Sequence, residues 1–163
     1  MRFDFAVPVK FSALAIWNHN QMGNAEAANP EPLADRCFRR THIYGTSDGV
    51  HWTPLTSTPV ITLPRTTGSP KELPFVVPNA QVTSAFKSVV IAADQVDGNY
   101  GAGFYGLSAV RFLVDPLTGV VPSSEVSVVA SACDAPQPSP RHLVDGAGMF
   151  GVYHDNAHFG DTM

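Results

Sequence analysis

Hydrophobic and polar residues alternate along several short segments of this chain, which is the two-residue period of a β-strand with one buried face. Phe3, Phe5 and Val7 alternate with polar or small residues near the start. The segment 107–112 is too short for a helix and leaves a glycine-rich turn, and alternation returns in 125–131. No segment carries a sustained apolar stripe at helical spacing. The pattern predicts an all-β domain, a sandwich or a barrel.

Unbroken apolar runs and turn signals add further strands. The run from Phe11 to Trp17 predicts a strand that is buried on both faces. Ser47-Asp48-Gly49 is a tight turn signal in which Gly49 is free to adopt positive φ, so a hairpin is expected around it. The irregular segment 22–36 predicts a long loop. The remaining strands are expected in 38–47, 51–53, 60–63, 73–77 and 86–93.

Composition and charge restrict the partners of this domain. The chain has 163 residues, 44% of them hydrophobic, which is enough for one domain with its own core. The formal net charge is −4 and no Lys/Arg run is present, which argues against nucleic acid or an anionic membrane as a partner. No apolar run approaches the roughly 20 residues that span a bilayer. Arg2, Asp4 and Lys10 interrupt the apolar start, so it does not resemble a signal peptide.

The chain contains two cysteines, Cys37 and Cys133, which permit one disulfide but no disulfide framework. Cys37 follows the long loop and Cys133 opens a proline-rich loop, and we expect the two to be unpaired. Two cysteines do not indicate whether the protein is found in an oxidising or in a reducing compartment.

Three motifs occur in order along the chain, namely IWNHN at 16–20, IYGTSDGVHW at 43–52 and YGLSAVRF at 105–112. In order and spacing they resemble the discoidin family, also called coagulation-factor type C domains. The resemblance covers residues 1 to about 113. It implies an antiparallel jelly-roll β-sandwich of the galactose-binding type, and an extracellular or cell-surface location.

Two further motifs, VVAS at 128–131 and LVDGAGM at 143–149, resemble the beginning of a discoidin domain but stand after its end. In that family the chain ends lie side by side, so a first strand attached behind the last one can still occupy its usual place. This implies one circularly permuted domain, with a main body at 1–113, a connector at 114–123 and the permuted first strand and loops at 124–163. The alternative is a fragment of a tandem array, cut inside one repeat and again inside the next.

The polar residues form no catalytic motif. No serine stands in a G-x-S-x-G elbow, and Asx hydrogen bonding in turns explains the acidic residues, so we expect no enzymatic activity. His154 and His158 would share one face of a helix, as zinc ligands do, but no helix is indicated there. A solvated loop is the favoured interpretation of that segment.

Calcium is favoured over zinc, because it takes hard oxygen ligands from carboxylates and carbonyls in turns. By the resemblance, a structural calcium ion would lie beside the Asp145-Gly146 motif, which makes Asp145 the candidate ligand. The family often supplies a glutamate in its last strand where this chain has Ala109, and that difference removes one bidentate donor. The alternative is that Asp145 bonds its own turn.

Discoidin-like domains bind ligands through loops at one end of the sandwich, with an aromatic ring and donors to hydroxyl groups. Three segments are expected to reach that end, 19–36, 94–104 and 133–142. Their side chains with suitable chemistry are His19, Asn20, Asn99, Tyr100 and Phe104. The resemblance thus implies a non-catalytic carbohydrate-binding module with a glycan partner; the alternative is a protein-interaction or adhesion module, which would use a broader and flatter surface.

The two tryptophans occupy motif positions at which the family buries the ring. An exposed indole would suit the C–H face of a sugar, but these positions favour packing in the interior. Trp17 and Trp52 are therefore both expected in the core.

Overall fold

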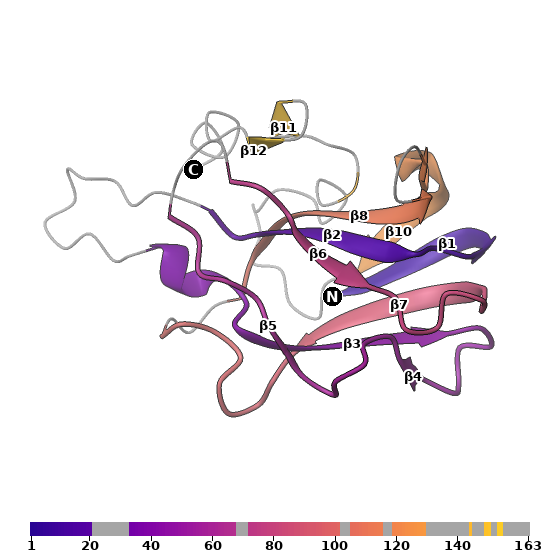
Figure 1. The fold of residues 1–163 in the computed structure, drawn as a ribbon, viewed down its shortest axis with the longest axis horizontal. Coiled ribbons are helices and arrows are strands. Elements are labelled where there is room, and N and C mark those ends of the chain that lie inside the picture. The colour runs from indigo at the N-terminus through magenta and orange to yellow at the C-terminus, as the bar shows by residue number, and fades with distance from the viewer. Residues whose placement is uncertain are drawn as a thin grey trace, which may run out of the picture.

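The computed structural model of this chain is built from short β-strands (Figure 1). It describes residues 1–20, 33–67, 72–101, 105–115, 119–129, 144, 149–150 and 153–154. The strands of the first sheet are β1 (Arg2–Val9), β3 (Arg40–Thr46), β4 (Thr53–Pro54), β5 (Ile61–Thr62), β7 (Phe86–Ala93) and β10 (Val126–Val129). Those of the second sheet are β2 (Ala13–Asn18), β6 (Phe75–Pro78), β8 (Leu107–Asp115) and β9 (Gly119–Val120). The remaining elements are two 3-10 turns, η1 (Leu33–Arg36) and η2 (Ser123–Glu125), and the pair β11 (Met149–Phe150) and β12 (Tyr153–His154).

The two main sheets pack against each other as a β-sandwich. The first has the strand order β10-β1-β7-β3-β4, with β5 also paired to β3, and the second has the order β6-β2-β8-β9. Each ladder in both sheets is antiparallel. The all-β prediction is confirmed in the part of the chain that the structure describes. None of the described helices is long and apolar enough to cross a membrane.

Strand β10 lies at the edge of the first sheet and pairs with the first strand of the chain. In this antiparallel register Phe3 faces Val128 and Phe5 faces Val126. Val126 is buried, so the late strand adds to the core as well as to the ladder. The late strand thus belongs to the same sheet as the first strand of the chain.

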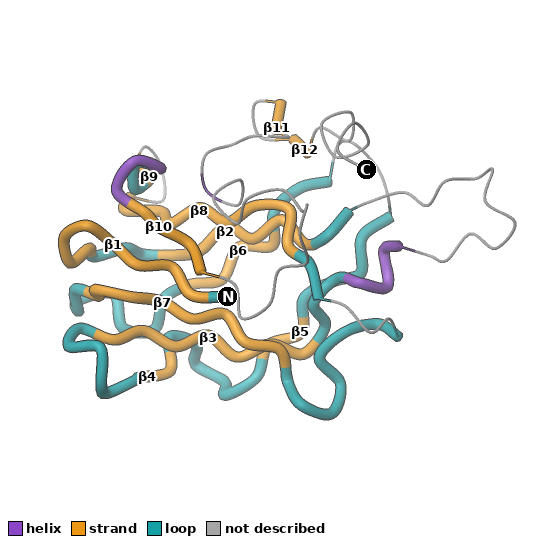
Figure 2. The backbone as a smooth tube through the Cα atoms, turned by 180° about the vertical axis from the view of Figure 1, so that it is seen from behind, coloured by secondary structure: helices purple, strands orange, loops and turns teal. Residues whose placement is uncertain are grey.

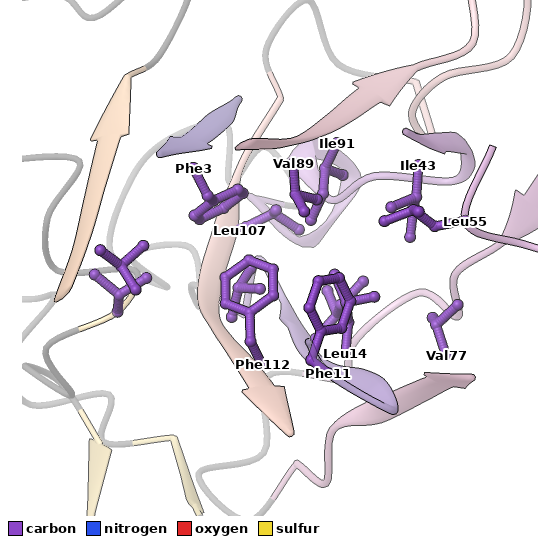
Figure 3. Packing of buried hydrophobic residues seen from close by; sticks show 14 of the residues in the cluster. Phe3, Phe11, Leu14, Ile43, Leu55, Val77, Val89, Ile91, Leu107 and Phe112 are labelled. Carbon is purple, nitrogen blue, oxygen red and sulfur yellow. The ribbon is translucent and has the colours of Figure 1, made fainter. Parts of the chain in front are cut away.

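The core lies between the two sheets, and Phe112 is at its centre (Figure 3). Its ring centroid lies 5.4 Å from that of Phe3, 4.9 Å from that of Phe5 and 5.3 Å from that of Phe11, with the planes steeply inclined. Such edge-to-face contacts place the positive ring edges against the negative faces. All six residues of β2 are buried, as its unbroken apolar run predicted.

The hairpin between β3 and β4 is held by the side chain of Asp48. Its Oδ1 atom accepts hydrogen bonds from the backbone N–H groups of Val50 and His51, both at 2.8 Å, and from the Thr46 hydroxyl at 3.0 Å. Its Oδ2 atom accepts a bond of 2.7 Å from Nδ1 of His51. Gly49 has a φ of 83°, the positive value that the turn signal predicted.

The ion pair between Asp48 and His51 makes the stability of the hairpin depend on pH. The bond with His51 holds the pKa of the Asp48 carboxyl well below its usual 3.8, and Asp48 raises the pKa of His51 above 6.5. The stabilisation of the folded state by the Asp48 carboxylate is complete above pH 3.8 and is lost as pH falls through the lowered pKa. The stabilisation by the protonated His51 ring is complete below pH 6.5 and is lost as pH rises through the raised pKa.

We therefore expect His51→Ala to lower the melting temperature more at about pH 5.5 than at about pH 8.5. Both effects should be small, because the two side chains are exposed and water screens their attraction. Thermal melts of parent and variant at both pH values measure the difference. An equal loss at the two pH values would contradict this account of the hairpin.

Two expectations from the sequence are corrected by the fold. Trp17 is buried as expected, but Trp52 is 38% exposed, because it precedes the two-residue strand β4 at the sheet margin, where Thr53 and Pro54 are exposed as well. Strand β9 lies inside the segment 114–123, which was interpreted as a connector only.

Cys37 is a free thiol at 0% exposure, and burial raises its pKa. Its expected lack of a disulfide agrees with this finding, while Cys133 lies outside the described residues. A buried, protonated thiol of this kind is unreactive.

Candidate functional site

The end of the sandwich opposite the β3–β4 hairpin gathers η1 and the loops that follow β2, β5 and β7 (Figure 2). We call this the loop end and define it by residues 18–20, 35–39, 63–67 and 94–101. The segments 19–36 and 94–104 were expected at one end, whereas 63–67 was not, because it carries no recognisable binding motif; the third expected segment, 133–142, lies outside the described residues. Hydrogen bonds join these segments to one another.

Asn18, the last residue of β2, clamps two of the segments together. Its Nδ2 atom donates to the carbonyl of Phe38 at 2.7 Å and to that of Pro64 at 3.0 Å. Its Oδ1 atom accepts from the backbone N–H of Phe38 at 2.9 Å and from that of His19 at 3.1 Å. Asn18 is 7% exposed, and both of its bonds with Phe38 are buried, away from bulk water.

His19 is half-buried and lies directly after this clamp. Its carbonyl accepts a hydrogen bond of 2.6 Å from the Thr66 hydroxyl. Its ring packs against the backbone of Gly106, where an added Cβ atom would lie 2.7 Å from Nδ1 of His19. The ring therefore keeps its place only because residue 106 has no side chain.

This contact gives a test of the local packing. Gly106→Ala is expected to lower the free energy of unfolding by about 1 to 3 kcal/mol, the usual cost of adding a methyl group to a full space. Adding His19→Ala should restore room for the methyl group, so the double variant should be more stable than the sum of the two single losses predicts. Chemical denaturation measures all three variants, and strictly additive losses would contradict the contact.

The loop after β7 is fixed by backbone hydrogen bonds and by the side chain of Asp94. The N–H of Arg39 donates to the carbonyl of Gly98 at 2.8 Å. Asp94 accepts from the N–H of Val96 at 3.0 Å, as Asx bonding in a turn predicts, and this bond lowers the pKa of Asp94. A Cβ at Gly98 would lie 2.4 Å from the carbonyl oxygen of Asp94, so the loop is too tight there for a side chain.

Tyr100 is the aromatic residue of this loop, and it is held on three sides. Its hydroxyl donates to the carbonyl of Leu63 at 2.6 Å, and its N–H donates to the carbonyl of Asp35 at 3.2 Å. The guanidinium carbon of Arg39 lies 5.4 Å from the ring centroid, within the range of a cation–π contact. Burial raises the pKa of the Tyr100 hydroxyl, which keeps it protonated as a donor.

Two ion pairs flank this ring. Nη1 of Arg39 lies 3.3 Å from Oδ1 of Asp97, and Nη2 of Arg65 lies 2.6 Å from Oδ1 of Asp35. Both guanidinium groups are half-exposed, at 42% and 47% of the side chain, so they retain donors that face water. The two positive charges are balanced by two negative ones. The surface therefore presents fixed hydrogen-bond donors and acceptors and has no excess of positive or negative charge from these pairs.

A small hollow of about 50 Å³ lies beside these pairs. Trp17, Arg65, Thr66, Leu73 and Phe75 are among the residues that line it. The hollow is far smaller than the roughly 300 to 1,000 Å³ of pockets that enclose small ligands, so it does not enclose a sugar ring. A ligand at the loop end would therefore lie on the surface.

The structure brings four of the predicted binding residues to the loop end, and three of them are partly exposed. His19 and Tyr100 both bond the segment 63–67, and Asn99 forms an isolated bridge with Phe38. Asn20 is 1% exposed, so it supports the loop from inside and offers no surface to a ligand. Phe104 lies outside the described residues.

Two residues of the loop end were not predicted from the sequence. Asn18 stands within the IWNHN motif, but a role as a clamp depends on loops that are distant along the chain. Arg39 was not selected as a binding residue, and its contact with Tyr100 joins residues 61 positions apart. An arginine next to a buried aromatic, Phe38, was the only signal in the sequence.

The predicted calcium ligand, Asp145, lies outside the described residues. Among the residues that the structure does describe, no group of three or more His, Cys, Asp or Glu side chains is placed to hold a metal ion. Ala109 is 1% exposed and supplies no ligand atom from its side chain. The calcium site remains a prediction from the resemblance.

Comparisons with protein-family models, with curated proteins and with solved structures found no match for this chain.

Proposed function

We propose that this chain is a non-catalytic carbohydrate-binding module of the discoidin type, and that it binds glycans on the surface of the loop end. The observation that carries the proposal is the Arg39–Tyr100 contact, flanked by two ion pairs that fix polar groups around an aromatic ring. A module of this kind would act outside the cell or at its surface.

The chemistry of the loop end suits a neutral, hydroxyl-rich ligand. Sugar hydroxyl groups both donate and accept, so they can bond the free donors of Arg39 and Arg65 and the carboxylate oxygens of Asp35 and Asp97. The ring of Tyr100 lies beside these groups, with the Arg39 guanidinium 5.4 Å from its centroid. Because the loops are tied by Asn18 and by the hydroxyl of Tyr100, few side chains need to be ordered on binding.

Replacement of Arg39 tests this assignment. Arg39→Ala removes a charged donor from the loop end, and loss of one such bond is expected to weaken glycan affinity by about tenfold or more. Arg2→Ala is the matched control, since Arg2 forms an ion pair with Asp4 at similar exposure but lies outside the loop end. Isothermal titration with a bound oligosaccharide measures both variants, and equal affinities for both would contradict the proposal.

A protein-interaction or adhesion module of the same fold is the second candidate. It is favoured by the shallow relief of the loop end and by Leu73 and Phe75, which are 68% and 39% exposed beside the hollow. An adhesion surface would depend on these apolar side chains. In that case Leu73→Ser would reduce cell attachment to the immobilised protein, while Arg39→Ala would leave it unchanged.

A further inference from the structure

His42 lies on β3, on the face of the first sheet that points away from the core. It stands between Thr41 and Ile43, which are both buried, and its own side chain is 25% exposed. The loop-end segment 94–101 begins directly after β7, which pairs with β3. The segment 63–67 follows β5, which pairs with β3 as well. His42 is therefore placed at the base of two segments of the loop end.

Both ring nitrogens of His42 lie within hydrogen-bond distance of an oxygen atom. Nδ1 is 2.9 Å from the carbonyl oxygen of Pro59, which precedes β5. Nε2 is 3.1 Å from Oδ2 of Asp94, the first residue after β7. One imidazole ring thus joins the chain that leads into the segment 63–67 to the start of the segment 94–101.

Both of these oxygen atoms can only accept a hydrogen bond. A backbone carbonyl carries no proton, and Asp94 is ionised because the bond from the N–H of Val96 lowers its pKa below the usual 3.8. A neutral imidazole donates from one nitrogen and accepts at the other, whereas the protonated ring donates from both. Only the protonated ring of His42 satisfies both contacts at once.

The other charged or titratable groups around the ring do not change this requirement. Nε of Arg40 lies 3.9 Å from the same Oδ2 of Asp94, so the guanidinium shares the carboxylate with His42. The ring of Tyr44 is nearly parallel to that of His42, with an interplanar angle of 11° and 6.0 Å between the centroids. Ala92, the partner of His42 on β7, has no ionisable group, and neither has the loop before β5.

We propose that His42 is a pH-sensitive tie between these two segments, which is closed at low pH and loses one of its two contacts as pH rises. Imidazole side chains change charge between about pH 5 and pH 8. Without the proton, a nitrogen lone pair faces either the carbonyl or the carboxylate, and that contact opens. The loop that the tie holds carries Asp97 and Tyr100, which both contact Arg39. The effect on a ligand rests on the proposed function, and glycan affinity should be higher at low pH.

Amide hydrogen exchange of the parent at about pH 5.5 and about pH 8 tests the tie without any ligand. The reporters are the N–H groups of Arg39 and Arg40, which donate to the carbonyls of Gly98 and Asp97. Their protection factors, corrected for the intrinsic pH dependence of exchange, should fall about threefold to tenfold at the higher pH, the effect of one lost hydrogen bond. His42→Gln should show equal protection at the two pH values, because glutamine does not titrate.

His51→Gln is the matched control, because His51 bonds Asp48 in the hairpin at the other end of the sandwich. It should keep the fall in protection that the parent shows. Equal protection of the parent at both pH values, or the same fall in a folded His42→Gln protein, would overturn the tie.

Titration of the parent with an oligosaccharide at the same two pH values separates the tie from the proposed function. A fall in protection without glycan binding at either pH would support the tie and reject the proposed function. Equal glycan affinity at both pH values would overturn the effect of the tie on the ligand.

Discussion

Phe112→Ala is expected to lower the free energy of unfolding by about 3 to 5 kcal/mol, the usual cost of removing a buried aromatic side chain. Phe112 is 1% exposed and contacts the rings of Phe3, Phe5 and Phe11. Phe3 and Phe5 belong to the first sheet and Phe112 to the second, so the cavity left by the variant would lie between the two layers. Few side chains are free to move into it, because the interior is close-packed and Phe3 and Phe5 are held in the ladders of β1.

The matched control is Phe75→Ala on the edge strand β6. Phe75 is 39% exposed, so the same substitution removes far less buried surface there. Denaturation in urea measures both variants. A loss for Phe112→Ala no larger than that for Phe75→Ala would show that the centre of the core lies elsewhere.

Ending the chain after Val121 is expected to abolish folding. The shortened chain lacks β10, which pairs with β1 and contributes the buried Val126. Without it, β1 becomes an open sheet edge, and the apolar side chains beneath are exposed to water. Far-UV circular dichroism and thermal melts should show no cooperative transition.

Ending the chain after Val129 is the control for this deletion, because it keeps β10 in place. We expect that chain to be less stable than the parent, since it lacks Val144, but still to melt cooperatively. A cooperative melt after deletion at Val121 would mean that the sandwich is complete without its late strand. The permutation that the resemblance implies would then have no energetic basis.

The strands were predictable wherever the hydrophobic pattern was long enough to read. The alternation of Phe3, Phe5 and Val7 and the unbroken run before Trp17 correspond to β1 and β2. Strand β9 was not predicted, because two residues cannot show a period. Trp52 was assigned to the core because its motif suggested it, whereas its exposure depends on how little of the sheet extends past β4.

The loop end was predictable in part. Tyr100 and His19 could be selected by residue type and by their place in loops, and both lie at that end. Arg39 could not be selected, since its contact with Tyr100 depends on how far the loop after β7 folds back. The burial of Asn20 depends on the packing of whole loops and not on its neighbours in sequence.

The most direct test of glycan binding is a glycan array probed with the purified full-length chain, with Arg39→Ala and Arg2→Ala as companions. We expect the parent and Arg2→Ala to bind one group of glycans that share a neutral terminal sugar, and Arg39→Ala to lose that signal. The loss should be specific, because Arg39 is the guanidinium that contacts the ring of Tyr100. Failure of the folded parent to bind any glycan on the array, or full binding by Arg39→Ala, would contradict the assignment of this surface.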